Sequence, residues 1–189
     1  MNPETIPKKE NFLKEIVKFT LIALAIVVPI RTYVAQPFIV SGASMDPTFQ
    51  SGEYLIVDQL TYHFSDPQRE DVIIFRYPRS PSTFFIKRII GLPGETVDVK
   101  NNVVTITNKE HPDGFQLSQP YIVNQSKTTN HFELKDDEYF VMGDNRSASS
   151  DSRYWGAVPR NLLIGKAFLR LLPINKAGVW PGQYTQIGS

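Results

Sequence analysis

The sequence predicts a mainly β protein that has a single apolar helix near its N-terminus. Short runs rich in β-branched and aromatic residues recur along the chain and are separated by turns containing Gly, Pro or Asn, a pattern typical of antiparallel sheets. One uncharged run, 19–30, lies close to the N-terminus and has no polar face. The stretch from about 109 to 135 is polar and aperiodic, so we expect a small inserted loop or subdomain there.

Composition restricts the classes of function that the chain can have. With 189 residues, 41% hydrophobic and 21% charged, it has the composition of a globular protein with one main domain. The formal net charge of +1 and the scattered basic residues give no electrostatic reason to expect nucleic acid as a partner. The sequence has no cysteine, which excludes thiol catalysis and thiolate metal sites. No H-E-x-x-H or similar cluster is present, so we expect neither a metal site nor a cofactor.

The apolar N-terminal run is long enough to span a membrane when its flanking residues are included. From 16 to 36 it reaches the roughly 20 residues that a bilayer-crossing helix needs, and Lys18 and Arg31 can extend their charges to the headgroups. More lysines precede the run than follow it, which predicts a cytoplasmic N-terminus and a domain on the outer face of the cell membrane. A cleaved signal is less consistent, because a cut after Ala35 would place Tyr33 at −3, where small residues are required.

A buried helix of a soluble domain is the other alternative for this run. Pro29 and the absence of a polar face argue against it. We therefore divide the chain into a cytoplasmic tail (1–15), a single-pass membrane anchor (16–36), a β domain (37–175, with the insert at about 109–135) and a C-terminal tail (176–189).

Beyond the anchor, the sequence indicates short strands joined by tight turns. Asn101 and Asn102 separate two alternating runs, and asparagine tolerates positive φ, so we expect a hairpin there. The expected strands are 38–40, 54–57, 71–77, 84–90, 96–99, 103–106, 139–142 and the apolar stretch 162–172.

The first candidate for chemistry is Ser44, which lies in a turn of small residues at 41–48. A serine hydroxyl is a weak nucleophile until a neighbouring base takes its proton. Gly42 and Ala43 leave room for a substrate backbone, and Pro47 restricts the turn. Because an ordinary surface turn has the same composition, the segment alone does not establish catalysis.

The candidate base is Lys87, which lies in an otherwise apolar strand. Phe85, Lys87 and Ile89 share one face of this strand, whereas Arg88 lies on the other. Burial between apolar neighbours would lower the pKa of the lysine, and the neutral amine can accept a proton from serine. A lysine that reaches solvent from an edge strand is the alternative. We expect at least one of these two adjacent cations to point out of the core, and the chemistry does not choose which.

A Ser–His–Asp triad is the main competing catalytic arrangement. It needs a positioned imidazole. His111 and His131 lie in the polar insert, and His63 follows no distinctive motif, so the triad is disfavoured.

The segment 143–153 is the third candidate part of a site. Its Asp, Asn and Ser side chains can bond their own backbone and form a rigid polar turn. Asp151 and Arg153 can pair to brace it, although composition alone also fits a surface loop.

Taken together, the segments 41–49, 71–94 and 139–165 resemble those of the type I signal peptidases, the bacterial leader peptidases of the Ser–Lys serine protease family S26. They cover less than half of the chain, but they occur jointly and in the family's order behind an apolar anchor. The resemblance implies a transmembrane helix followed by a signal-peptidase-like domain of coiled antiparallel sheets. It also implies a membrane-bound serine endopeptidase, signal peptidase I, that removes signal peptides from exported preproteins.

The resemblance assigns roles to the catalytic candidates. It makes Ser44 the nucleophile and Lys87, not Arg88, the general base. Ser149 matches the hydroxyl that hydrogen-bonds and orients the lysine.

The same resemblance implies an oxyanion hole that uses the Ser44 backbone N–H. Gly42 occupies a position where some members of the family carry a serine donor and others carry glycine, so a backbone N–H must serve here. Asp151 and Arg153 match a supporting ion pair behind the site.

The family cleaves after small residues at −1 and −3 of the signal peptide. Bulky apolar walls would leave space for alanine and exclude larger side chains. Ordinary core packing is the alternative for each wall residue. The residues that match the walls are Phe38, Val40, Met45, Leu55, Ile74, Phe85 and Ile86.

Two other functions remain open at this point. One is a Ser–Lys peptidase of the same fold with a different dedicated target, and the other is a catalytically silent, membrane-tethered binding domain. Expected partners are the signal peptides of secreted preproteins and the lipid bilayer near the secretion translocon. Phe49, Phe84 and Phe85 suggest an apolar patch that enters the bilayer beside the site.

Overall fold

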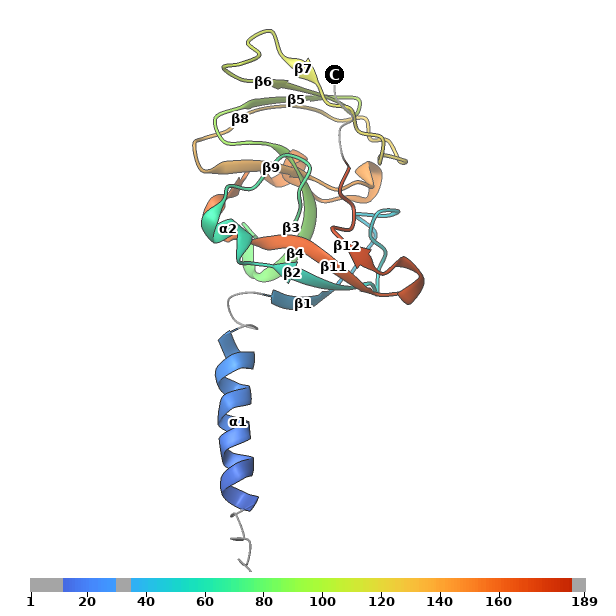
Figure 1. The fold of residues 1–189 in the computed structure, drawn as a ribbon. Coiled ribbons are helices and arrows are strands. Elements are labelled where there is room, and N and C mark those ends of the chain that lie inside the picture. The colour runs from blue at the N-terminus through green and yellow to red at the C-terminus, as the bar shows by residue number, and fades with distance from the viewer. Residues whose placement is uncertain (1–11, 30–34, 185–189) are drawn as a thin grey trace, which may run out of the picture.

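The computed structural model describes residues 12–29 and 35–184 and has a mainly β architecture (Figure 1). One long helix, α1 (Phe12–Pro29), precedes two antiparallel sheets, which confirms the predicted fold class in its β part. The remaining helices are single turns: α2 (Thr61–Phe64), η2 (Arg146–Ala148), α3 (Ser152–Trp155), η3 (Arg160–Leu162) and η4 (Ile174–Lys176).

The larger sheet carries the candidate active site. Its strands follow the order β1-β2-β11-β3-β4-β9-β10, with β12 beside β11, and all neighbours are antiparallel. Their bounds are β1 (Ala35–Ile39), β2 (Tyr54–Asp58), β3 (Val72–Tyr77), β4 (Ser80–Gly91), β9 (Glu138–Met142), β10 (Val158–Pro159), β11 (Leu163–Leu172) and β12 (Gly178–Val179).

The smaller sheet contains the expected hairpin and most of the polar insert. Its order is β7-β6-β5-β8, built from β5 (Thr96–Lys100), β6 (Val103–Thr107), β7 (Phe115–Gln116) and β8 (Thr129–Glu133). Asn101 and Asn102 both have positive φ, 49° and 69°, as the hairpin prediction requires. The segment 109–135 supplies β7 and β8, which widen this hairpin into a four-stranded sheet.

Strand β3 explains how the sheet organises two of the three hydrophobic cores. Ile73 and Phe75 face one cluster, whereas Val72 and Ile74 face another, because successive side chains point to opposite faces. All four are buried, as expected for a strand covered on both sides. The third core lies between β4, β9 and the smaller sheet.

Helix α1 lies apart from both sheets (Figure 1), and residues 12–28 are all exposed. Among the helices that the structure describes, none is both long and apolar enough to cross a membrane. The structure begins α1 at Phe12, and it places Ala35 and Gln36, expected in the anchor, in β1. Arg31 and Tyr33, which entered the topology prediction, lie outside the described residues.

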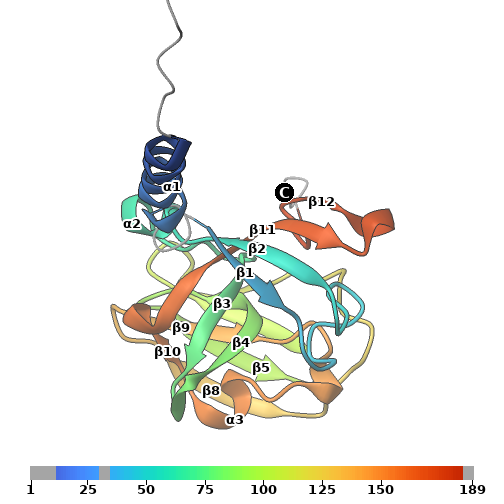
Figure 2. The same cartoon turned by 90° about the horizontal axis from the view of Figure 1, so that it is seen from below.

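The C-terminal residues 176–184 pack onto the domain. Strand β12 pairs with β11, as Figure 2 shows from below. The sequence predicted only a tail for this part of the chain. Strand β12 was not recognisable because it contains few apolar residues and because the strand with which it pairs, β11, is a separate element.

Candidate active site

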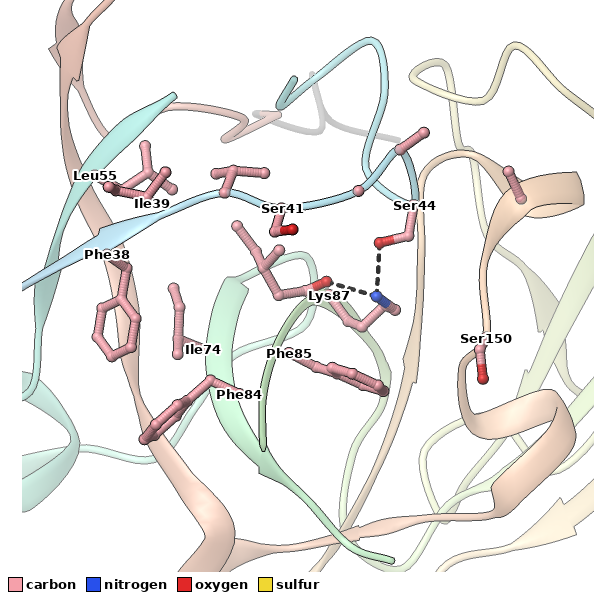
Figure 3. A pocket seen from close by; sticks show the side chains of 15 residues that line it. Phe38, Ile39, Ser41, Ser44, Leu55, Ile74, Phe84, Phe85, Lys87 and Ser150 are labelled. Carbon is pink, nitrogen blue, oxygen red and sulfur yellow. Dashed lines mark hydrogen bonds between the residues drawn. The ribbon is translucent and has the colours of Figure 1, made fainter. Parts of the chain in front are cut away.

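The structure brings Ser44 and Lys87 together at one end of the larger sheet. Ser44 Oγ and Lys87 Nζ lie 2.7 Å apart, although 43 positions separate them in the chain. Figure 3 shows the lysine side chain extending toward the serine hydroxyl. Lys87 Nζ also donates to the Ile86 carbonyl oxygen over 2.9 Å, which fixes the direction of the amine. A hydroxyl and an amine at this distance can exchange a proton directly.

Lys87 is buried because it lies in the middle of the sheet rather than at an edge. Strand β4 runs between β3 and β9, and Lys87 is opposite Ile73. Only 4% of Lys87 is exposed, and its Nζ lies 5.1 Å from the centre of the Phe85 ring. Burial lowers the pKa of Lys87 to about 8, while the negative charges of Asp151 and Asp144 oppose this shift.

The turn that carries Ser44 is held from the other side by the loop after β9. The Asn145 backbone N–H donates to the Ser44 carbonyl over 3.0 Å, and its side-chain amide donates to the Ala43 carbonyl over 3.0 Å. Gly143 is required at this junction because a Cβ there would overlap both the Ser44 carbonyl oxygen and the Ser149 hydroxyl. The loop and the turn therefore form one backbone-bonded unit.

Arg88 corrects the expectation that one of the two adjacent cations points out of the core. Both are buried, and Arg88 is 0% exposed. Its Nε and Nη2 donate to the two Asp144 carboxylate oxygens over 2.9 and 2.6 Å, and Glu70 adds a further charge at 3.8 Å. The sequence argument failed because it considered the strand alone, whereas the carboxylates that neutralise Arg88 come from other segments.

Asp151 and Arg153 form a buried ion pair beneath the loop. Arg153 Nε and Nη2 donate to the two Asp151 oxygens over 2.7 and 2.8 Å, and both side chains are 0% exposed. Asp151 Oδ2 also accepts from the Gly143 N–H over 3.0 Å. The pair thus supports the glycine that contacts the Ser44 turn.

Ser149 is buried, and its Oγ has no hydrogen-bond partner among the described residues. Its position against Gly143 places it beside the Ser44 turn. The orienting bond to Lys87 that the resemblance implied stays a prediction.

A pocket of about 290 Å³ opens beside the two candidate catalytic side chains (Figure 3). Of the seven residues predicted as walls, six line it: Phe38, Val40, Leu55, Ile74, Phe85 and Ile86. Met45 is the exception. It is 1% exposed and packs in the core below the pocket, because the turn after Ser44 directs it inward.

Several pocket residues escaped the sequence interpretation. They are Ile39, Ser41, Phe84, Ala148 and Ser150. The family resemblance assigned walls from one face of 38–40 and did not include Phe84, but the pocket lies where a strand end meets a turn, so both faces of these strands contribute. Asp144 and Asn145 were also missed as site residues. The sequence feature that could have identified them is this pair of polar residues shortly after the buried strand 139–142.

The proposed aromatic membrane patch is wrong for Phe49, which is 0% exposed. Its ring packs with Met45 and Leu55 in the core below the pocket, because the backbone turns back at this point through a Phe49 N–H to Met45 carbonyl bond. Phe85 packs against Phe75 and Tyr77, which leaves Phe84, at 40%, as the exposed member of the three.

Within 12–29 and 35–184, no group of three or more His, Cys, Asp or Glu side chains could hold a metal ion. What the residues present can do is nucleophilic chemistry. A hydroxyl faces a buried amine of lowered pKa, next to a small apolar pocket open to an extended chain.

Comparison with known proteins gives consistent matches along the chain. A family model described as "Signal peptidase, peptidase S26" matches residues 13–172. A "Probable signal peptidase I-1" from Synechocystis is 36% identical over 94% of this chain and 92% of its own. A signal peptidase I from Leptolyngbya laminosa is 37% identical over 91% and 86%. A solved signal peptidase I from Enterococcus faecalis V583 is 33% identical over 54% of this chain and 97% of its own, with a TM-score of 0.44.

Proposed function

The chain belongs to the signal peptidase family, peptidase S26, and is a serine endopeptidase that removes signal peptides from preproteins; we propose that Ser44 and Lys87 perform this reaction. The observation that carries the proposal is the 2.7 Å distance between Ser44 Oγ and Lys87 Nζ, with Lys87 only 4% exposed. A catalytically silent domain has no observation in its favour, since both side chains of the dyad are present and in contact. A Ser–Lys peptidase with a different target would have the same dyad, and the similarity to signal peptidases over most of the chain favours signal peptides as the substrate.

Acylation begins with proton transfer from Ser44 to neutral Lys87. With the pKa of Lys87 at about 8, a substantial fraction of the amine is neutral near that pH. As the proton moves to Nζ, Ser44 Oγ forms a bond to the scissile carbonyl carbon and the carbonyl oxygen becomes an oxyanion.

The backbone N–H of Ser44 is the donor available for that oxyanion. No described residue accepts a hydrogen bond from it. Gly42, with φ of 89°, offers no side-chain donor but leaves open space where a Cβ would lie, so a substrate carbonyl can approach. One such donor contributes about 3–4 kcal/mol to transition-state stabilisation.

The protonated Lys87 then completes the cycle. It donates its proton to the leaving amine as the C–N bond breaks, which leaves an acyl ester on Ser44. The neutral lysine next takes a proton from a water molecule that attacks this ester. Oγ leaves with that proton, and the free serine is restored.

We attribute the specificity for small residues at −1 and −3 to the bulky apolar walls of the pocket. Side chains such as Phe38, Leu55 and Ile86 enclose it beside the catalytic groups, and they would exclude side chains larger than alanine. An extended signal peptide would lie alongside β1 and β4, whose residues form the opposing walls.

We also propose that α1, with the residues after it, anchors the protein in the cell membrane with the catalytic domain outside, near the secretion translocon. The support is the uninterrupted exposure of its apolar side chains, such as Phe19 at 69% and Leu24 at 52%, together with the lysines that precede it.

The anchor is tested by placing charges on its apolar surface. Leu24→Glu with Val27→Glu should release the full chain from alkaline-washed membranes. Leu171→Glu, exposed on the domain, should not.

The catalytic assignment is tested with a preprotein carrying alanine at −1 and −3. The full chain in detergent should cut after the −1 alanine, and Ser44→Ala and Lys87→Met should not. Cleavage that survives Lys87→Met would contradict the lysine mechanism, whereas a folded but inactive parent would contradict the assigned substrate.

A further inference from the structure

Residues 173–184, the last that the structure describes, form a segment that we call the C-terminal strap. The family match ends at residue 172, so the strap lies beyond it. Strand β12 pairs with β11, and the Trp180 N–H donates to the Phe168 carbonyl over 2.6 Å. The Trp180 ring lies 4.9 Å from the Phe168 ring. These contacts attach the strap to the C-terminal half of β11, an interior strand of the larger sheet.

Past this attachment, Gly182 reaches the two segments that carry the catalytic side chains. Its carbonyl accepts from Arg88 Nη1 over 2.7 Å, and Arg88 directly follows Lys87. On its other side, a Cβ at Gly182 would lie 2.8 Å from both Thr48 Cγ2 and Phe49 Cε2. Its φ of 75° also favours glycine. Only glycine therefore allows the strap to lie so close to the Ser44 turn.

Arg88 connects these contacts to the active-site loop. Besides its paired bonds to Asp144, its Nη1 donates to the Glu70 carbonyl over 3.0 Å as well as to Gly182. Thr48 Oγ1 in turn donates to Asp144 Oδ2 over 2.6 Å. The strap, the strand of Lys87 and the turn of Ser44 thus meet at one buried guanidinium and one buried carboxylate.

Tyr184 covers this cluster on the solvent side. Its ring lies 5.3 Å from Arg88 Cζ and 5.0 Å from the ring of Tyr121, which itself lies 4.1 Å from Arg88 Cζ. Tyr121 is buried, whereas Tyr184 remains 38% exposed. Removing the Tyr184 ring would admit water to Arg88 without opening the hydrophobic core.

We propose that the C-terminal strap is a positioning element of the active site, in which Gly182 and Tyr184 hold the Ser44 turn against the Lys87 strand. The inference rests on the proposed catalytic roles of Ser44 and Lys87. The strap touches neither residue directly; it acts through Arg88, Thr48 and Phe49. Small displacements at this level matter, because misplacing a catalytic group by about 1 Å can cost on the order of a hundredfold in rate.

The first test compares two glycines of the same strap in the full chain. Gly182→Ala should lower kcat for preprotein cleavage about tenfold or more, with KM close to that of the parent, because binding walls are untouched. Gly178→Ala is the matched control. A Cβ at Gly178 meets nothing within 4 Å and its φ is not positive, so kcat should stay at the parent value.

The second test removes the Tyr184 ring that covers Arg88 and adds no atom near the Ser44 turn. Tyr184→Ala should lower kcat in the same way, and Tyr184→Phe, which keeps the ring, should retain parent activity. KM should stay close to the parent value in Tyr184→Ala, because Tyr184 lines no wall of the pocket.

Circular dichroism and thermal melting of every variant separate positioning from folding. Loss of kcat in folded Tyr184→Ala, with KM near the parent value and rescue in Tyr184→Phe, supports the strap whatever the stability of Gly182→Ala. Parent kcat in folded Tyr184→Ala overturns it and leaves the proposed function intact. A loss of kcat that merely follows the folded fraction also overturns it. If neither the parent nor Gly178→Ala cleaves, the proposed function fails and the strap proposal fails with it.

Discussion

Lys87 and Arg88 are adjacent buried cations in opposite electrostatic environments. Arg88 is paired with both oxygens of the Asp144 carboxylate, whereas the hydrogen bonds of Lys87 among the described residues go to the neutral oxygens of Ser44 and Ile86. Burial lowers the pKa of Lys87, which in the described part of the chain donates to no carboxylate that would offset it. At Arg88 the hydrogen bonds to Asp144 outweigh the same burial and raise the pKa. The structural cation, Arg88, and the candidate base, Lys87, are thus neighbours on β4.

The first prediction is that Lys87 destabilises the fold at neutral pH. At pH 7 lysine is protonated in both folded and unfolded chains, and the lowering of its pKa from 10.5 to about 8 corresponds to a cost of up to about 3 kcal/mol. Lys87→Met should therefore raise the free energy of unfolding at pH 7, measured by urea denaturation. The exposed Lys100→Met should leave it unchanged.

The sign of this effect also fixes its pH dependence. Between pH 8 and 10.5 the folded chain has released the Lys87 proton and the unfolded chain still binds it, so the parent gains stability as the pH rises. The advantage of Lys87→Met should therefore be full below pH 8 and fade toward pH 10.5. An equal or lower stability of this variant at pH 7 would show that Lys87 is not buried as described.

The second prediction concerns Gly143. A Cβ at this position overlaps the Ser44 carbonyl oxygen and the Ser149 hydroxyl, so Gly143→Ala must separate the loop from the catalytic turn. We expect a loss in kcat of about a hundredfold, measured on the alanine-containing preprotein. Gly178→Ala, where a Cβ meets nothing within 4 Å and φ is not positive, should lose far less. Parent activity in Gly143→Ala would mean that the loop does not position Ser44.

The third prediction concerns pocket specificity. Ile86 lines the pocket, whereas Ile164 packs on the same core cluster without lining it. Ile86→Ala should improve cleavage of preproteins with valine or leucine at −1 or −3 relative to alanine by about tenfold or more, since a single methylene in an apolar pocket changes discrimination by about 10- to 200-fold. Ile164→Ala should keep the parent preference. If both variants behave alike, the pocket does not read these residues.

The fourth prediction concerns the ion pair beside the dyad. Asp144→Asn removes the carboxylate that accepts two hydrogen bonds from the fully buried Arg88. Among the described residues only Glu70, at 3.8 Å, then remains as a charged partner, so the variant should cost about 3–5 kcal/mol of unfolding free energy. The exposed pair of Lys135 and Glu138 is the control, and Lys135→Gln should cost less than about 1 kcal/mol. Similar costs in the two variants would contradict the burial of the Arg88–Asp144 pair.

Local sequence patterns were sufficient to predict much of this fold. β-branched residues in short runs between turns made several strands recognisable, namely 54–57, 71–77 and 103–106. The pair of asparagines between two such runs correctly predicted a hairpin. The short strands β7 and β8 were not predicted, because they lie in a polar segment. Each pairs with one strand of the hairpin and buries only one of its faces, so its sequence contains few apolar residues.

The site could be predicted only up to the contacts that cross the fold. Ser44 and Lys87 were identifiable from their unusual neighbours and from the family resemblance. The partners of Arg88 were not, because Asp144 and Gly182 lie 56 and 94 positions away. Met45 was misassigned to the pocket for the same reason: the direction of a side chain in a turn depends on the core against which it packs.

The pH dependence of kcat/KM for the full chain tests the central claim most directly. If neutral Lys87 is the base, kcat/KM for the alanine-containing preprotein should rise with pH through a single ionisation near pH 8 and then level off. A rise centred near pH 6.5, where histidine titrates, or a profile that is flat from pH 6 to 9, would contradict a lysine base at this site.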